Sequence, residues 1–388
     1  MPRNKEKAGI IAAEKRPASD SVGHRLLSLV GVTLAVWAFG CARSFSEAAT
    51  QAAPPQQIIL GGSVIQKQPD DALELTTYDD HDVFHAAAEA ERLNEHTRAR
   101  ALYQRLLGEM PTSPLVAASH FNLGLSFEHE QDWPHAAQAY APIVAQPMPV
   151  EADERQTWID AHFRRAACLA KIGDWFETRR LFETVLKTRE LTDEDKTEAM
   201  LGRAIALEEL GEAFDAELAF SAVLQGSRET QDETMRGFAA EAAFHSAEIA
   251  RKRFDSVKLA FSTETPSTDA LSKLLDAKCE ELVVAQGRYV RAIRYGDAYT
   301  VAAAGNRIGG MYEDLYAELV GLEVPSDLTP EQVDVYKEEV KNRVKVLAEK
   351  AIRIYEHTAL IGRRTDSAGE WVKKSEAALA KLRAAYLR

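Results

Sequence analysis

The sequence predicts an all-α protein, built as a solenoid of helix hairpins and followed by a C-terminal helical region. Three observations support this fold class. Alanine, leucine, glutamate and arginine dominate from residue 70 onward, where glycines are few, as expected for helices. Apolar residues recur there at helical spacing. One pattern of small and aromatic residues also returns four times, with the aromatic residue at Tyr103, Tyr140, Phe182 and Phe220.

Each of the four segments consists of an apolar helical stripe, a short break and a second stripe. The aromatic residues are 37, 42 and 38 positions apart, and the breaks fall at Asn94, Gln131, Gly173 and Gly211. A small residue three or four positions from an aromatic one lets two helices approach closely while the ring fills the gap. Each segment therefore predicts a helix hairpin. Because one hairpin cannot bury its own apolar face, we expect the hairpins to stack.

This pattern resembles the tetratricopeptide repeat (TPR). The resemblance covers residues 80–226, and a degenerate fifth unit is expected from Gly237 to Thr263. The spacing exceeds the usual period of about 34 residues, so we expect a TPR-like solenoid over residues 79–265 with irregular joints. An ordinary helical bundle with coincidental spacing is the alternative. The matching residues are Leu123-Gly124, Phe127, the turn glycines, the alanine–aromatic pairs and Pro111, while Thr178 departs from the usual alanine and Phe244, Phe254 and Phe261 mark the fifth unit.

Residues 1–40 are predicted to form a signal peptide. A basic leader precedes an apolar run from Leu26 that ends in Ala38-Phe39-Gly40-Cys41, an order typical of secretory signals. The run is shorter than the roughly 20 residues that a transmembrane helix needs. Its end resembles a bacterial lipobox, which implies that Cys41 is acylated and tethers the mature protein to a membrane. A simple cleavable signal, with Cys41 incidental, is the alternative.

The residue after Cys41 is alanine rather than the aspartate that retains some lipoproteins in the inner membrane. We therefore expect the protein to be lipid-anchored in the cell envelope, at the outer membrane and facing the periplasm. Residues 41–78 have the composition of a flexible tether. Within them, two β-prone runs flank Gly61-Gly62 and predict a hairpin, which either stays disordered or adds a strand to a partner's sheet.

The C-terminal helical region is expected over residues 266–388. It is rich in alanine and tyrosine up to Leu322, and Val324-Pro325 interrupts it. Thr329-Pro330-Glu331-Gln332 then reads as a helix start with a reciprocal cap. One helix is expected from there to about Leu360, and a last one from Glu370 to Tyr386.

Composition and motifs argue against nucleic-acid binding, metal binding and catalysis. A net charge of −13 disfavours nucleic-acid binding. His81 and His85 stand one helical turn apart beside aspartates, but helix capping explains these aspartates better than a metal. Cys168 and Cys279 lie far apart in a solenoid and form no metal-ligand spacing, so buried free thiols are expected. No catalytic motif is present in the sequence; we expect no enzyme, no metal, no cofactor and no small-molecule substrate.

The TPR resemblance implies that the first helix of each hairpin lines a concave groove. We align the four repeats and compare the residues at equivalent positions of their first helices. One groove position holds three phenylalanines and a leucine. The next position holds aliphatic residues, and a third is rich in carboxylates. An apolar ladder rimmed by carboxylates would bind a helix or an extended peptide. The alternative is that the chain's own tether or tail covers it. The expected partner-binding residues are Phe84, Phe121, Leu125, Glu128, Phe163, Leu201 and Ile205.

The order of tether, TPR block and tyrosine-rich tail indicates a more specific resemblance within the TPR proteins. With Tyr295-Gly296-Asp297-Ala298-Tyr299 and Arg307-Ile308-Gly309-Gly310-Met311-Tyr312, the chain resembles the envelope TPR lipoproteins of bacterial gliding-motility machinery, the GltE type. That resemblance implies a noncatalytic scaffold that binds other envelope proteins of a multiprotein complex. The alternative is a TPR lipoprotein of outer-membrane protein assembly, similar to BamD.

Overall fold

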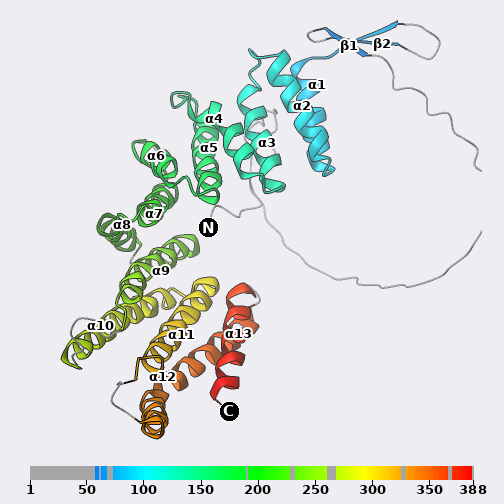
Figure 1. Ribbon diagram of the computed structural model, residues 1–388. Helices are drawn as coiled ribbons and strands as arrows, with labels where there is room; N and C mark the ends of the chain where they lie inside the picture. The colour runs from blue at the N-terminus through cyan, green and yellow to red at the C-terminus, as the bar shows by residue number, and fades with distance from the viewer. Residues whose placement is uncertain are drawn as a thin grey trace, which may run out of the picture. The chain divides into compact units, whose positions relative to one another are not determined.

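The computed structural model describes residues 57–60, 63–67, 73–188, 191–227, 232–259, 268–324, 329–365 and 369–386. The predicted signal peptide and Cys41 lie outside the described residues. Within them the chain forms three strands and thirteen helices (Figure 1). It divides into two compact units, one up to Ala161 and one from His162 onward. None of the described helices is both long enough and apolar enough to cross a membrane.

The first unit begins with a small antiparallel sheet in the order β1-β2-β3. Ile58 pairs with Ile65, so the hairpin predicted around Gly61-Gly62 is confirmed. A third strand, which the sequence analysis did not predict, pairs with β2. Paired strands therefore lie within the segment expected to be a tether. Their bounds are β1 Gln57–Leu60, β2 Ser63–Lys67 and β3 Leu73–Thr77.

The helices of the first unit form the first two predicted hairpins. Asp79 begins α1 with a capping box, in which its side chain accepts a hydrogen bond from the Asp82 backbone N–H and the Asp82 side chain accepts one in return. Capping is thus the role of these aspartates. The bounds are α1 Asp80–Arg92, α2 His96–Glu109, α3 Val116–His129 and α4 Trp133–Val144; α5 Ala152–Lys171 crosses into the second unit.

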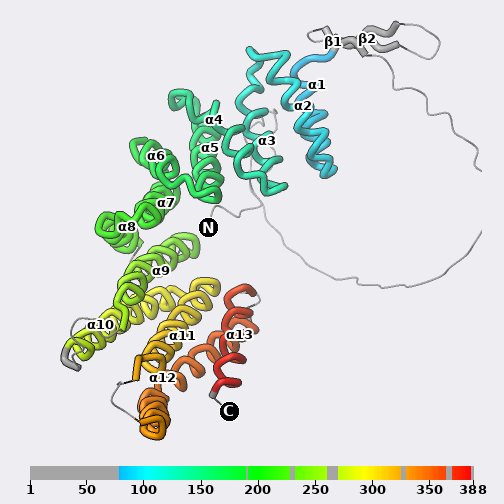
Figure 2. Tube along the Cα trace, viewed as in Figure 1, coloured from blue at the N-terminus to red at the C-terminus, as the bar shows by residue number. Residues whose placement is uncertain are grey.

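The second unit continues the stack of helix hairpins. This stack extends beyond residue 265, where the sequence predicted that the solenoid ends. Here α9 pairs with α10, α11 with α12, and α13 packs on α11 and α12; the trace in Figure 2 follows the same order. The bounds are α6 Trp175–Leu186, α7 Asp193–Glu209, α8 Ala213–Gly226, α9 Glu233–Ser256, α10 Thr268–Ile293, α11 Ala298–Val320, α12 Pro330–Thr365 and α13 Gly369–Tyr386.

The fifth hairpin differs from its predicted extent. It consists of α9 and α10 and reaches Ile293 rather than ending near residue 263. Phe244 packs against Tyr289 of α10, with ring centroids 5.6 Å apart, so Tyr289 is its second-helix aromatic residue. Phe254 is fully buried, as expected, whereas Phe261 lies outside the described residues.

The predicted breaks between paired helices are confirmed. Asn94 and Gln131 adopt φ of 59° and 60°, and Gly173 and Gly211 adopt 82° and 80°. This left-handed conformation ends one helix and turns the chain into the next. The predicted reciprocal cap of α12 is also present, because Thr329 and Gln332 each donate a backbone N–H to the other's side-chain oxygen.

One packing motif recurs in the second and sixth hairpins. In α3, a Cβ added to Gly124 would meet the Tyr140 ring at 2.4 Å, and Tyr140 donates its hydroxyl hydrogen bond to Glu128 at 2.6 Å. In α11, a Cβ on Gly309 would meet the Tyr355 ring at 2.6 Å, and Tyr355 donates to Glu313 at 3.0 Å. Each carboxylate lies one helical turn after its glycine. The pair α11–α12 is therefore a sixth hairpin of the same design.

Candidate functional site

The phenylalanines expected to form an apolar ladder are core residues instead. Phe84, Phe121, Phe163 and Leu201 are only 1% to 6% exposed. Each ring packs edge-on against the aromatic residue of the second helix in its own hairpin, at centroid distances of 5.8, 5.6 and 5.8 Å. Repeat register placed them correctly on the first helix of each hairpin. The expectation that they face an open groove is wrong, because the neighbouring helix covers them.

The remaining predicted groove residues are partly or fully buried, and one of them already accepts a hydrogen bond. Leu125 is buried, while Glu128 and Ile205 are half-buried. Glu128 already accepts the hydrogen bond from Tyr140. Partner binding by Glu128 and Ile205, the two members that keep some exposure, stays a prediction.

Two further carboxylates on first helices, Glu91 and Glu208, are paired with basic side chains of the protein itself. Glu91 lies 2.7 Å from the His96 ring nitrogen. Glu208 lies 2.7 Å from His245 and 2.9 Å from Lys252. Burial opposes ionisation of Glu208, but the hydrogen bonds from His245 and Lys252 outweigh it and lower the pKa of this carboxyl. These acids connect helices and do not form an open carboxylate rim.

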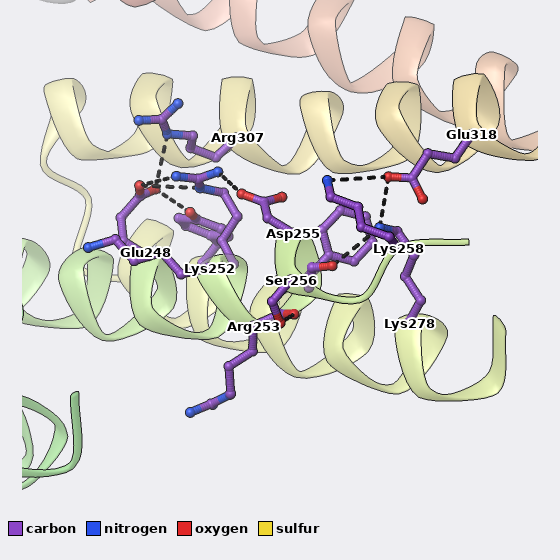
Figure 3. A network of polar contacts seen from close by, with 12 residues as sticks. Glu248, Lys252, Arg253, Asp255, Ser256, Lys258, Lys278, Arg307 and Glu318 are labelled. Atoms are coloured by element: carbon purple, nitrogen blue, oxygen red, sulfur yellow. Dashed lines mark hydrogen bonds and ion pairs between the residues drawn. The ribbon is translucent and has the colours of Figure 1, made fainter. Parts of the chain in front are cut away.

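A second polar network joins α9, α10 and α11 (Figure 3). Glu248 accepts hydrogen bonds from Arg251 at 3.1 Å and from Arg307 at 3.0 Å, and from the Tyr289 hydroxyl. Burial and the adjacent Glu248 carboxylate together raise the pKa of Tyr289 far above its ordinary value. Tyr289 is thus a neutral hydrogen-bond donor, and this network fixes the packing of three helices.

The same network contains a buried amine. Lys278 is fully buried and donates to the Val257 carbonyl at 2.6 Å, the Phe254 carbonyl at 3.3 Å and Glu318 at 3.0 Å (Figure 3). Its ammonium also lies 4.3 Å from the centre of the Phe254 ring. A positive charge at the C-terminal end of α9 is favourable because the last carbonyls of a helix carry partial negative charge. Lys278 therefore holds the end of α9 against α10 and α11.

Acidic residues line an open pocket next to this amine. Asp255, Asp314 and Glu318 line it together with Lys258, and its volume is about 410 Å³. Burial and the neighbouring carboxylates, Asp255 first, raise the pKa of Asp314. Across the described residues, no three or more His, Cys, Asp and Glu side chains are grouped so that they could hold a metal ion.

Among the described residues of the second unit, α6 and α8 carry exposed phenylalanines and an exposed leucine. Phe176, Phe214 and Leu218 are 61%, 80% and 65% exposed. Phe176 and Phe214 each stand six residues before the core aromatic residue of their hairpin, Phe182 and Phe220, so they hold the same repeat position. The sequence analysis missed them, although this equivalent spacing was visible in it.

An ion pair links α6 to the residue that precedes α8. Arg179 of α6 lies 2.8 Å from Glu212, the residue that precedes α8. The Arg179 guanidinium also lies 5.3 Å from the centre of the Phe176 ring. This contact places the start of α8, with Phe214, beside α6. We call the exposed set the α6–α8 surface; it consists of Ile172, Phe176, Leu210, Phe214 and Leu218.

Several solved structures are similar to this chain. A tetratricopeptide repeat protein from Parabacteroides merdae shares 14% identity, with 76% of this chain and 98% of that chain covered and a TM-score of 0.36. The apo form of RapI shares 11% identity, with coverage of 78% and 98% and a TM-score of 0.42. A TPR repeats protein from Bacteroides fragilis shares 10% identity, with coverage of 77% and 99% and a TM-score of 0.28.

No protein-family model matches the chain. No curated protein matches it either. The helices themselves, packed in sequential pairs with left-handed turns and small–aromatic contacts, define an all-α protein of TPR-like hairpins.

Proposed function

We propose that the protein is a noncatalytic scaffold for protein–protein interaction. One observation carries this proposal: a TPR-like stack of hairpins exposes two phenylalanines at the same repeat position, next to Leu218, on the α6–α8 surface. Exposed apolar patches of this kind mark interaction surfaces in soluble proteins. The buried acids and bases of the second unit, in contrast, are engaged in contacts between helices.

We further propose that the scaffold is lipid-anchored through Cys41 in the bacterial envelope, at the outer membrane and facing the periplasm. The basic leader, the short apolar run and the terminal cysteine support this localisation. The protein would serve a trans-envelope gliding-motility complex, which rests on the sequence resemblance alone. An outer-membrane assembly complex is the alternative.

Two experiments test these proposals. In labelling with palmitate, Cys41→Ser should lose the label and either leave the membrane fraction or retain its leader, whereas equal labelling would refute the anchor. Co-purification from membranes then separates the functions. Recovery with motility proteins supports the proposed complex, recovery with a β-barrel assembly complex supports the alternative, and recovery with a single enzyme contradicts both.

A further inference from the structure

We infer that the α6–α8 surface binds an amphipathic helix of a partner protein, whose apolar side is flanked by lysine and arginine. This inference rests on the proposed scaffold function and specifies the chemistry of its partner. It follows from three features of the described residues: the exposed apolar side chains, their arrangement on two neighbouring elements, and the charge around them.

The apolar side chains form one short ridge on α8 and a single exposed ring on α6. Phe214 and Leu218 stand one turn apart on α8, and Phe176 stands on α6. The Arg179–Glu212 ion pair links α6 to the residue that precedes α8. Side chains four residues apart form the ridges between which a second helix places its own side chains. An incoming helix with apolar residues at helical spacing fits this arrangement.

The charge around Phe214 and Leu218 is acidic, whereas Phe176 on α6 has Arg179 and Arg180 close to it in the sequence. Residues 208–226 contain five acidic residues and no basic one. Three of these acids are neutralised: Glu208 by Lys252, Glu212 by Arg179, and Glu217 by Arg253 and Arg288.

Glu209 and Asp215 differ from those three acids. Both are exposed, and among the described residues no cation forms an ion pair with either. A partner that places lysine or arginine beside its apolar residues would pair with them.

This charge also disfavours a membrane surface as the occupant. Anionic lipid headgroups attract basic segments, and the unpaired carboxylates of this surface would repel them. A second copy of the chain would bring the same carboxylates together, because a twofold interface pairs one patch with itself. A basic, apolar helix is the occupant that both features favour.

The test uses the full-length chain and a synthetic amphipathic peptide of about five turns, roughly 18 residues. The peptide carries leucine and phenylalanine on one face and lysine on the other, and a second peptide replaces every lysine with glutamate. Fluorescence anisotropy measures the Kd of both peptides. We expect the lysine peptide to bind at least about tenfold more tightly than the glutamate peptide, with an affinity that falls as salt rises. Equal binding of the two peptides would refute the inference.

Variants then locate the bound peptide. Phe214→Ser with Leu218→Ser should raise the Kd of the lysine peptide at least about tenfold, as expected for buried anchors of an interface. Glu209→Gln with Asp215→Asn should raise it at least about threefold. The matched control is Leu93→Ser, which changes an apolar residue that is 52% exposed in the first unit and should leave the Kd unchanged. Circular dichroism should report the same helical content for all variants, since the changed side chains are exposed.

Several outcomes would overturn the inference. They are an unchanged Kd in the Phe214→Ser, Leu218→Ser variant, a concentration-dependent dimer that this variant abolishes, or binding to anionic vesicles that it abolishes. A peptide of residues 3–40 that binds this surface more tightly than the lysine peptide would make the chain's own leader the occupant. The scaffold function is judged separately. If the same variant still co-purifies with envelope proteins, the scaffold proposal stands and the assignment of this surface fails.

Discussion

Replacing Gly124 with alanine tests the glycine–aromatic packing that the second and sixth hairpins share. The added Cβ would lie 2.4 Å from the Tyr140 ring, whereas carbon atoms in contact are normally about 3.5–4.0 Å apart. The ring would therefore have to move by more than about 1 Å. Tyr140 is fully buried and its hydroxyl donates to Glu128 at 2.6 Å, so this movement would strain both contacts.

The expected magnitude follows from opposing effects. Overpacking a core costs about 1–3 kcal/mol. Complete loss of a hydrogen bond to a charged group costs about 1.5–3 kcal/mol. Replacing glycine in a helix with alanine returns about 1 kcal/mol. We therefore expect Gly124→Ala to lower the free energy of unfolding by about 1.5–5 kcal/mol, the upper end applying if the hydrogen bond is lost completely. Gly309→Ala should cost a similar amount, since its surroundings repeat those of Gly124.

The control is Gly237→Ala in α9, where an added Cβ meets nothing within 4 Å. This variant should gain up to about 1 kcal/mol. Urea unfolding followed by circular dichroism compares the three variants, and hydrogen exchange locates the loss, which should begin in α3 and α4 for Gly124→Ala. If Gly124→Ala were as stable as Gly237→Ala, the close approach of these helices would be wrong.

Three further predictions concern the buried residues. Phe121→Ala should lower the free energy of unfolding by about 3–5 kcal/mol, measured by urea unfolding; a fully stable variant that loses only partner binding would restore the open groove. Lys278→Met should cost about 1–3 kcal/mol, because it leaves two buried carbonyls and Glu318 without their donor; an unchanged melting temperature would contradict this. Burial lowers the pKa of His245, but Glu208 raises it by more, and the pKa of Glu208 is itself lowered. The stability from this pair is therefore complete between about pH 4.3 and pH 6.5. It is lost as pH rises through the folded pKa of His245 and also as Glu208 is protonated in acid. His245→Gln should remove the decline with rising pH in a pH series of melting temperatures, and a persisting decline would point to another group.

Local sequence signals predicted the hairpins well. Three of the four breaks contained glycine or asparagine, which tolerate positive φ, while Gln131 adopts it without that preference. The aromatic residues Tyr103, Tyr140 and Phe220 are fully buried, as the spacing indicated. Such features are set by residues near one another in the chain, and one sequence reveals them.

The prediction of an open groove was wrong because it depends on contacts between helices and not on local sequence signals. Repeat register identifies equivalent positions, but an apolar residue at an equivalent position can face either the neighbouring helix or solvent. Phe121 and Phe214 recur with the same regularity, yet one is buried and the other is 80% exposed. The difference depends on contacts between helices, which spacing alone does not specify. The sixth hairpin was missed because Gly309 and Tyr355 stand 46 positions apart, compared with 16 for Gly124 and Tyr140.

The contact between glycine, aromatic ring and carboxylate also explains how this chain tolerates hairpins of unequal length. The contact between Gly124 and Tyr140 recurs between Gly309 and Tyr355, although the second helix is 12 residues long in α4 and 36 in α12. Extra residues therefore enter at helix ends and in loops, where a longer connection costs little free energy. Surface positions outside the contact are then free to vary from hairpin to hairpin. Phenylalanine occupies one such position in the third and fourth hairpins, whereas Thr97 and Pro134 stand there in the first two. The same core can thus be kept throughout the stack while a binding surface is built on two of its members.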